Sequence, residues 1–218
     1  MDVSLLPDYL NQYLESLVPP RPPELQAMEE YARQHRFPII GPVCGYFCYQ
    51  ITRLMNARRV FELGSGFGYS TAWFAQGVQE NGGGEVWHVV WDANLSQQAR
   101  LHLERLGVSE VVRYVIGEAV TTLRETPGLF DLIFLDIDKE DYPAALEVIV
   151  TKLRPGGLLI ADNMLWSGRI FDPADRSDST RGIQTLTRLL THDPRWKTTL
   201  LPLRDGLILA FRDERRIA

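Results

Sequence analysis

The stretch FELGSGFGYST, residues 61–71, connects an apolar segment to a segment of helical character through three glycines. Gly64, Gly66 and Gly68 leave the backbone without side chains at this turn, so a flat ligand can approach the main chain closely. A turn of this kind between a strand and a helix indicates an α/β fold with a ligand at the turn. A purely structural role for the glycines is the alternative.

The spacing of the glycines distinguishes between classes of ligand. A dinucleotide-binding turn follows the pattern G-x-G-x-x-G/A, but Tyr69 stands where the last Gly or Ala of that pattern would be. Glu62 lies two residues before Gly64, where its carboxylate is placed to pair with an ammonium group rather than with a pyrophosphate. The turn therefore disfavours a dinucleotide as the ligand.

Strand and helix candidates alternate along the rest of the chain. There are five apolar strand candidates in this part of the chain: RRVFEL (58–63), EVWHVVW (85–91), VVRYVI (111–116), FDLIFLD (130–136) and GLLIAD (157–162). A segment of helical periodicity follows each of the first four. The alternation predicts parallel strands joined by helical crossovers. Near the C-terminus, WKTTLLPL and GLILAFR lie on either side of a turn-prone RDG. We therefore expect a doubly wound, mostly parallel seven-stranded α/β sheet of Rossmann type with an antiparallel C-terminal edge.

Two further helices are expected ahead of the sheet. Residues 3–18 carry an apolar stripe that begins at Leu6, and after the stiff segment VPPRPPE a second helical stretch covers residues 24–35. We expect an N-terminal helical extension over residues 1–37 and a ligand-binding domain over residues 38–218. The extension either packs over the sheet as a cap or binds a second copy of the chain.

Composition and charge exclude several classes of protein. The chain has 218 residues, of which 45% are hydrophobic and 23% charged, which fits one well-filled core. A net charge of −5 argues against binding to a nucleic-acid backbone. No apolar run approaches the roughly 18 residues of a membrane span, and no basic leader precedes the apolar residues of the N-terminus. We expect a cytoplasmic protein without membrane contact, and we expect Cys44 and Cys48 to be core residues.

The segment FLDIDKEDY places several charged residues directly after the fourth strand candidate. In an open α/β sheet, ligands bind beyond the carboxyl ends of the strands, so this segment and the glycine turn are expected at the same edge. Glu140 and Asp141 favour the start of the following helix, where acidic residues complement the helix dipole. Asp136, Asp138 and Lys139 are left as candidates for chemistry.

Three segments carry a resemblance to a known family. ELGSGFGYST resembles the adenosylmethionine-binding turn of class I methyltransferases. Together with LDIDKEDY and ADNMLWSGRI, it resembles the cation-dependent small-molecule O-methyltransferases, the group that holds catechol and caffeoyl-CoA O-methyltransferases. The similarity runs from about residue 24 to the C-terminus. It implies a methyltransferase sheet and S-adenosylmethionine as the cofactor.

The resemblance also implies a metal site. Asp136 ends the fourth strand candidate, while Asp162 and Asn163 end the fifth, so neighbouring parallel strands would bring two carboxylates and an amide oxygen together. The matching residues hold the metal in the family, and oxygen ligands favour Mg²⁺, with Mn²⁺ or Ca²⁺ as alternatives. The other interpretation is that Asp162 and Asn163 only cap the loop that follows them.

Lys139 stands at the position of the general base in the catechol enzymes that the chain resembles. A catechol whose two oxygens share a cation is more acidic, and the same cation favours the neutral amine of Lys139, which would then take the proton. Asp136 and Lys139 are therefore the catalytic candidates, and Asp138 resembles a family carboxylate that faces the cofactor. A surface lysine at a helix start is the alternative for Lys139.

The resemblance implies most of the cofactor contacts, but the second strand departs from it. Besides Asp138, the implied cofactor-binding residues are Glu62, Gly64, Ser65, Gly66, Ser70, Glu118 and Ala119. The second strand departs from the family, because the ribose-binding acid falls on Val90 and the nearest acid is Asp92. Asp92 either reaches the ribose hydroxyls or caps the following helix. Trp91 either stacks on adenine or serves packing.

The segment MLWSGRIFDPADRSDSTRG, residues 164–182, is expected to form a loop over the site. Family members select their acceptors with this loop and with the N-terminal segment. Trp166 and Arg181 are candidates for contacting an aromatic ring or an acidic group of the acceptor. Their alternatives are core packing for Trp166 and a solvated helix start for Arg181.

Taken together, the residues and the resemblance predict an S-adenosylmethionine-dependent and cation-dependent O-methyltransferase. The expected acceptor is a small aromatic molecule with two neighbouring hydroxyls. The alternatives are a metal-independent methyltransferase, an NAD-dependent oxidoreductase on the same fold, and a cofactor-binding protein without catalysis. The resemblance also suggests a homodimer.

Overall fold

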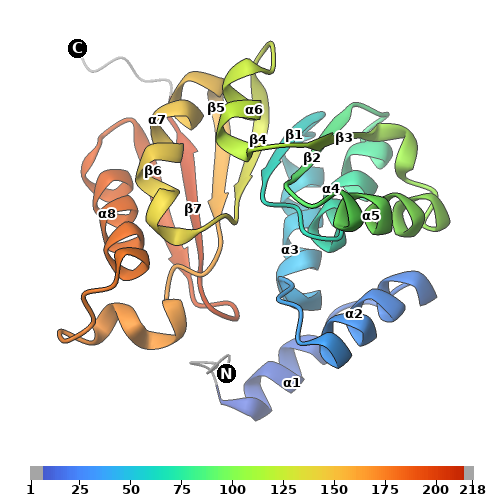
Figure 1. Cartoon of the computed structure of the whole chain (residues 1–218), viewed down its shortest axis with the longest axis horizontal. Helices are drawn as coiled ribbons and strands as arrows, with labels where there is room; N and C mark the ends of the chain where they lie inside the picture. The colour runs from blue at the N-terminus through green and yellow to red at the C-terminus, as the bar shows by residue number, and fades with distance from the viewer. Residues whose placement is uncertain (1–6, 214–218) are drawn as a thin grey trace.

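The computed structural model describes residues 7–213 and contains one seven-stranded sheet in that range (Figure 1). The strands are β1 (Arg59–Leu63), β2 (Glu85–Val90), β3 (Val112–Ile116), β4 (Phe130–Leu135), β5 (Leu153–Ala161), β6 (Trp196–Leu201) and β7 (Leu207–Arg212). Their order across the sheet is β3-β2-β1-β4-β5-β7-β6. The first five strands pair in parallel, and β7 runs antiparallel between β5 and β6. The predicted fold is therefore confirmed.

Strand order reverses next to β1, which pairs with β2 on one side and with β4 on the other. The chain builds outward from β1 to β3 and then returns to add β4 and β5 on the opposite side. Ligands of open α/β sheets bind at this reversal, beyond the carboxyl ends of the strands. The glycine turn after β1 and the charged segment after β4 therefore begin side by side.

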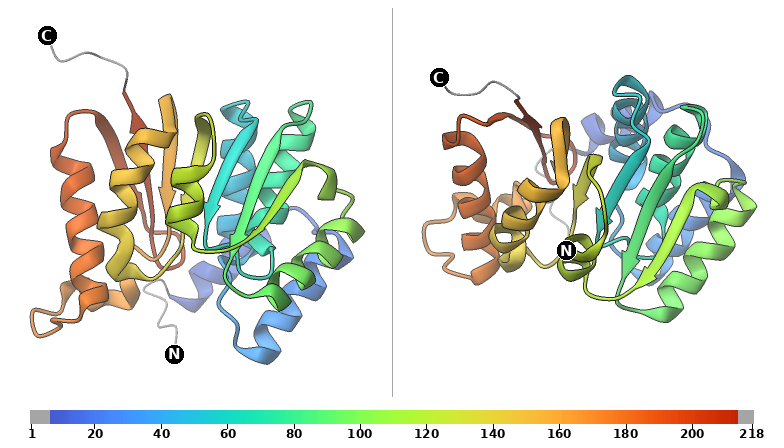
Figure 2. Two further views of the ribbon diagram at one scale, coloured as in Figure 1. Left: turned by 45° about the horizontal axis from the view of Figure 1, so that its top comes forward. Right: turned by 90° about the horizontal axis from the view of Figure 1, so that it is seen from above.

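Helices cover both faces of the sheet (Figure 2). Buried side chains of α3 (Gly41–Leu54), α4 (Tyr69–Glu80) and α5 (Ala93–Arg105) pack on one face. Those of α6 (Ala119–Glu125), α7 (Tyr142–Lys152) and α8 (Asp178–His192) pack on the other face. Neighbouring strand residues point to opposite cores, because side chains alternate along a strand. This alternation makes the central strands apolar throughout.

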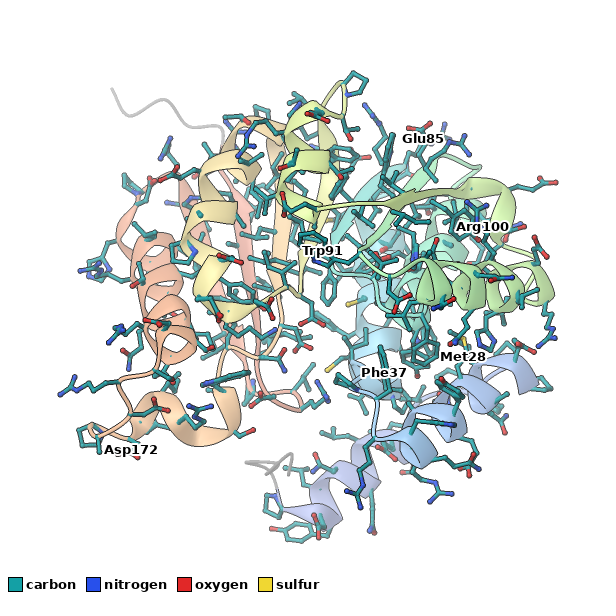
Figure 3. The ribbon with its side chains drawn as sticks, viewed as in Figure 1. Met28, Phe37, Glu85, Trp91, Arg100 and Asp172 are labelled. Atoms are coloured by element: carbon teal, nitrogen blue, oxygen red, sulfur yellow. The ribbon has the colours of Figure 1, made fainter. Side chains whose placement is uncertain are left out.

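The second N-terminal helix, α2 (Pro23–His35), packs against α4 and α5. Met28 is buried between α2 and the rest of the fold (Figure 3). The Tyr69 hydroxyl donates to Glu29 Oε1 at 2.8 Å, and His102 Nδ1 lies 2.6 Å from Glu24 Oε1. This helix shares a core with the sheet, as expected of a cap, while the boundary between residues 37 and 38 stays a prediction.

The first helix, α1 (Asp8–Ser16), buries none of its residues. Tyr13 on its apolar stripe is 61% exposed, and Tyr9 and Leu17 are exposed as well. Residues 3–6 of the predicted helix, including Leu6, lie outside the described residues. Leu10 and Leu14 of the stripe are partly buried, and α1 contacts α3, so the stripe is only partly covered in the single chain.

Two sequence expectations differ from the structure. Strand β5 begins at Leu153 instead of residue 157, because the chain passes directly from the end of α7 into an extended conformation. Helix α8 begins at Asp178, within the expected loop 164–182. Its start is set by Ser177, whose hydroxyl oxygen accepts from the Thr180 backbone N–H at 3.3 Å.

Short 3₁₀ turns connect several elements: η1 (Ser109–Val111), η2 (Lys139–Asp141) and η3 (Trp166–Phe171). The second and third of these follow β4 and β5, at the edge where ligands are expected. Among the helices in residues 7–213, none combines the length and the apolar character needed to cross a membrane. Cys44 and Cys48 are free thiols buried in α3, which fits the core role expected for them.

Candidate functional site

A cavity of about 750 Å³ opens at the carboxyl ends of the parallel strands. Its wall combines the glycine turn after β1, the end of β2, the start of α6, and the segments that follow β4 and β5. Phe37, from the connection between α2 and α3, and Trp91, at the end of β2, complete the lining (Figure 3). The cavity therefore coincides with the reversal of strand order, where the sheet topology predicts a ligand.

The glycine turn is held tightly against both neighbouring strands. Ser65 exchanges two hydrogen bonds with Val89 of β2, one from its backbone N–H at 3.0 Å and one to its hydroxyl at 2.9 Å. Gly64 has φ +88°, and a Cβ placed there would lie 2.1 Å from the carbonyl oxygen of Asp136. Only glycine fits this approach, so the turn after β1 and the end of β4 form one rigid edge.

The Glu62 carboxylate lies behind the glycine turn and not in the cavity. It is fully buried and is not among the residues that line the cavity. Its Oε2 accepts from the Thr71 hydroxyl at 2.5 Å, and the same hydroxyl lies 3.0 Å from His88 Nδ1. Burial raises the pKa of Glu62 to about 7. The structure thus gives Glu62 a supporting place, whereas the sequence had suggested a direct contact with an ammonium group.

Asp136 and Asp162 follow neighbouring strands and lie at the same edge. The Asp136 backbone N–H donates to Leu63 of β1 at 2.9 Å, and that of Asp162 donates to Leu135 of β4 at 3.1 Å. Asp162 is only 1% exposed. Burial, followed by the negative charge of Asp136, raises the pKa of Asp162 to about 7. The carboxylates are therefore close enough to act on each other, as expected of neighbouring parallel strands.

Asn163 completes the set of oxygen donors, and its backbone is in the left-handed region with φ +58°. Its side-chain amide nitrogen donates to Asp205 Oδ2 at 3.2 Å. The other oxygen of Asp205 accepts from the Ser167 backbone N–H at 2.6 Å. Asp205 therefore fixes both the amide of Asn163 and the turn that follows it.

Arg204 and Asp205 are site residues that the sequence pattern did not indicate, because RDG is typical of a turn. Both residues line the cavity. Strand β6 has the direction of β5, since both are antiparallel to β7, and so the β6–β7 turn lies at the carboxyl end of β5. This topological argument would have placed the turn at the site. Arg204 Nη1 lies 3.4 Å from Asp162 Oδ2.

The chemistry of the donor set suits a hard divalent cation. Asp136, Asp162 and Asn163 supply two carboxylates and an amide oxygen, the ligand types that Mg²⁺ and Mn²⁺ take in proteins. Across residues 7–213, no group of three or more His, Cys, Asp or Glu side chains is arranged to hold a metal. The candidate set has only two such side chains, Asp136 and Asp162, and its third member is the amide of Asn163.

Lys139 is buried at the same edge, with its side chain turned toward Asp136. Its Nζ donates to Asp136 Oδ1 at 2.8 Å and to the Ile137 carbonyl at 3.0 Å. The residue is 8% exposed, which argues against an ordinary surface lysine. Helix α8 presses on its backbone, since a Cβ at Gly182 would lie 2.0 Å from the Lys139 carbonyl oxygen. The ammonium group and the backbone of Lys139 are thus both held in place.

Most of the predicted cofactor-binding residues line the cavity. Gly64, Ser65, Gly66, Ser70, Glu118, Ala119 and Asp138 are all part of its wall. The Glu118 carboxylate also caps α6, because it accepts from the backbone N–H groups of Val120 and Thr121 at 2.7 and 2.6 Å.

Asp92 does not line the cavity. Its carboxylate caps α5 by accepting from the Asn94 backbone N–H at 2.7 Å. The structure therefore favours the capping alternative for Asp92, and its ribose contact stays a prediction. Val90 and Trp91 form this part of the wall instead, and Trp91 is 71% exposed.

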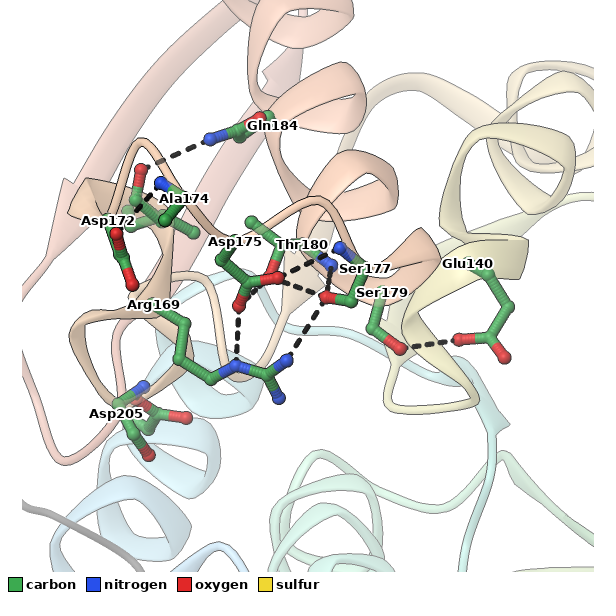
Figure 4. Close-up of polar contacts among 12 residues, drawn as sticks. Glu140, Arg169, Asp172, Ala174, Asp175, Ser177, Ser179, Thr180, Gln184 and Asp205 are labelled. Carbon is green, nitrogen blue, oxygen red and sulfur yellow. Dashed lines mark hydrogen bonds and ion pairs between the residues drawn. The ribbon is translucent and has the colours of Figure 1, made fainter.

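In the segment after β5, the Arg169 side chain contacts Asp175 and Ser177 (Figure 4). Arg169 Nε donates to Asp175 at 2.7 Å, and its Nη2 donates to the Ser177 hydroxyl at 3.1 Å. The Arg169 guanidinium also lies 5.4 Å from the centre of the Trp166 ring. Trp166 lines the cavity as predicted, and its φ of +49° belongs to a tight left-handed turn.

Arg181 lies elsewhere. It is exposed on α8, where it pairs with Asp178, and it is not among the residues that line the cavity. Its helical position explains the difference. Because α8 begins before residue 181, the side chain projects from the outer surface of a helix and not from a loop over the site. The structure does not place Arg181 in the cavity wall, and its contact with an acceptor stays a prediction.

Comparison with known proteins agrees with this architecture. Residues 23–213 match the family model described as O-methyltransferase. Catechol O-methyltransferase of Mycobacterium tuberculosis is 30% identical over 195 residues, which cover 88% of each chain. Caffeoyl-CoA O-methyltransferase 5 of Nicotiana tabacum is 28% identical, over 94% of this chain and 91% of the relative.

Among solved structures, the O-methyltransferase of Bacillus cereus in complex with SAH superimposes with a TM-score of 0.84 at 28% identity. The alignment covers 94% of this chain and 97% of that chain. The family model spans the glycine turn, both candidate carboxylates and Lys139 in one continuous match. The chain therefore belongs to the S-adenosylmethionine-dependent O-methyltransferase family.

Proposed function

We propose that this protein transfers the methyl group of S-adenosylmethionine to one hydroxyl of an aromatic molecule with two neighbouring hydroxyls, assisted by a divalent cation and by Lys139 as base. The observation that carries the proposal is the contact of 2.8 Å between Lys139 Nζ and Asp136 Oδ1. It places a buried amine against a candidate metal ligand, in the same cavity as the glycine turn.

The cofactor side of the cavity is the wall built on β1 and β2. The turn that contains Gly64 and Gly66 offers exposed backbone to the amino-acid part of S-adenosylmethionine, and Asp138 offers a negative charge to its ammonium group. Trp91 presents a large exposed ring where an adenine could stack. The SAH complex of the related Bacillus cereus enzyme supports this choice of cofactor.

The acceptor side is the edge formed by Asp136, Asp162 and Asn163. These residues would hold a divalent cation, with Mg²⁺ as the first choice from the oxygen donors. When bound, the cation would make a hydroxyl of the acceptor more acidic and orient it. Trp166 lies next to this edge and offers an aromatic wall for a planar acceptor.

As the base, Lys139 would take the proton in its neutral amine form. Its Nζ donates to Asp136 and to the Ile137 carbonyl, so the side chain is already held at this edge. The glycine turn lies directly against Asp136, which keeps the methyl donor and the acceptor hydroxyl close together. Holding two reactants in position accounts for a large share of the rate in such transfers.

The test is an acceptor panel incubated with labelled S-adenosylmethionine. We expect methyl transfer to catechol but not to resorcinol or phenol, because only neighbouring hydroxyls can share one cation. Lys139→Met should remove transfer to catechol while SAH binding persists. Equal transfer to all three acceptors would contradict the proposal, as would full activity of Lys139→Met.

One observation favours a second candidate function, a metal-independent methyltransferase. Asp162 already has a positively charged partner, since Arg204 Nη1 lies 3.4 Å from its Oδ2. In this candidate, the guanidinium and Lys139 supply the positive charge that stabilises the acceptor oxygen, and Asp136 and Asp162 only position them. Methyl transfer that continues in the presence of a chelator would select this candidate.

A further inference from the structure

The position of Arg204 is fixed by the backbone around it. The β6–β7 turn is tied to the segment after β5, because the Met164 N–H donates to the Gly206 carbonyl at 3.0 Å and the Leu165 N–H donates to the Asp205 carbonyl at 2.8 Å. Arg204 itself has φ +50°, a left-handed conformation that is uncommon outside glycine. Unusual backbone of this kind is enriched at functional sites.

The guanidinium points at a carboxylate that a metal ion would use. Arg204 Nη1 lies 3.4 Å from Asp162 Oδ2, and the Arg204 side chain is 27% exposed at the cavity wall. On the other side of the edge, Lys139 Nζ lies 2.8 Å from Asp136 Oδ1. Each carboxylate of the donor set therefore has a cationic partner.

These pairings have a consequence for metal binding. A divalent cation is attracted to the carboxylates of the donor set, but here it meets two positive side chains close to its ligands. The guanidinium of an arginine stays protonated in proteins. Arg204 therefore keeps its charge, and it must share or give up Asp162 when a metal arrives.

We propose that Arg204 competes with the divalent cation for Asp162 and thereby sets the metal affinity of the site. The proposal rests on the cation-dependent function proposed above and concerns this chain's own arginine. Removing the guanidinium should tighten metal binding by about tenfold or more, because like charges a few ångströms apart at a partly buried site repel strongly.

The experiment measures Mn²⁺ binding to the full chain through the electron paramagnetic resonance signal of free Mn²⁺. Arg204→Gln and Arg204→Gly both remove the guanidinium, and glycine also suits the left-handed backbone, so one variant guards against misfolding of the other. Arg204→Lys keeps a positive charge. Arg188→Gln removes the same charge from the exposed surface of α8, outside the cavity wall, and serves as the matched control.

We expect tighter Mn²⁺ binding by Arg204→Gln and Arg204→Gly, with Arg204→Lys and Arg188→Gln close to wild type. If only Arg204→Gln and Arg204→Gly bound Mn²⁺, the competition would be supported, but the wild-type protein would not be cation-dependent. Equal Mn²⁺ affinity in all variants would overturn the competition but leave the cation-dependent function standing. The same conclusion would follow if Arg188→Gln gained as much Mn²⁺ affinity as Arg204→Gln. Absence of binding in every variant would overturn both.

Discussion

The close approach of Gly64 to Asp136 gives the sharpest test of how the two halves of the site are joined. An added Cβ at Gly64 would lie 2.1 Å from the Asp136 carbonyl oxygen, whereas real Cβ atoms essentially never come closer than 3.0 Å. About 0.9 Å must therefore be made up by moving the glycine turn or the end of β4. Gly64→Ala should separate the cofactor wall from the candidate metal edge.

Gly83 is a matched control for the backbone strain. Its φ of +90° equals that of Gly64 within a few degrees, but a Cβ there would meet nothing within 4 Å. Left-handed strain costs about 1–2 kcal/mol for a residue with a Cβ, and both alanine variants share this cost. Overpacking adds about 1–3 kcal/mol, and only Gly64→Ala should carry this second cost.

The assay combines denaturant unfolding, SAH titration and methyl transfer for both variants. We expect Gly83→Ala to lose about 1–2 kcal/mol of unfolding free energy and to keep wild-type binding and turnover. Gly64→Ala should lose about 2–5 kcal/mol in total. Its kcat/KM should fall about a hundredfold, because a displacement near 1 Å misaligns the reactants. Similar stability losses in the two variants, with unchanged SAH binding in Gly64→Ala, would refute the reasoning.

Three further predictions concern Lys139, Glu62 and helix α1. Lys139→Met should lower kcat by about 10²–10⁴-fold and leave the SAH dissociation constant unchanged in calorimetry; a variant with wild-type kcat would exclude Lys139 as the base. The pKa of Glu62 is raised from 4.5 to about 7 by burial, so its protonation favours the folded state below pH 4.5 and this contribution is lost as the pH rises to about 7. Between these pH values the unfolding free energy of wild type should therefore fall by about 3 kcal/mol relative to that of Glu62→Gln. A difference between the two proteins that does not change with pH would contradict the raised pKa of Glu62. The partly exposed stripe of α1, where Tyr13 is 61% exposed, is expected to be covered in a homodimer; Tyr13→Lys should then shift the mass measured by light scattering from dimer to monomer, and a monomeric wild type would contradict it.

The sequence predicted the sheet and the candidate edge well because both depend on local patterns. Alternation of apolar and helical segments predicted parallel strands joined by crossovers. The rule for carboxyl ends of strands and the family resemblance together predicted that Asp136, Asp162 and Lys139 lie at one edge. Each of these residues directly follows a strand or begins the next turn, and the structure shows that β4 and β5 are neighbours.

What the sequence could not predict depends on contacts between distant segments. The position of Glu62 beside the glycines predicts a contact with the ligand. In the structure its carboxylate accepts instead from the Thr71 hydroxyl at 2.5 Å, in the core behind β1. Arg204 and Asp205 come from a hairpin about forty residues after Asn163, and only the antiparallel pairing of β7 brings them to the edge. Asp92 shows the opposite case, since its carboxylate makes the local helix cap that was the sequence alternative to a ribose contact.

The most direct test of the central claim is methyl transfer from labelled S-adenosylmethionine to catechol, measured with Mg²⁺, after removal of metal by a chelator, and again after Mg²⁺ is restored in excess. The proposed roles of Asp136, Asp162 and Asn163 predict transfer that disappears with the chelator and returns with Mg²⁺. Transfer that continues unchanged in the chelator would contradict the cation-dependent mechanism and select the metal-independent one.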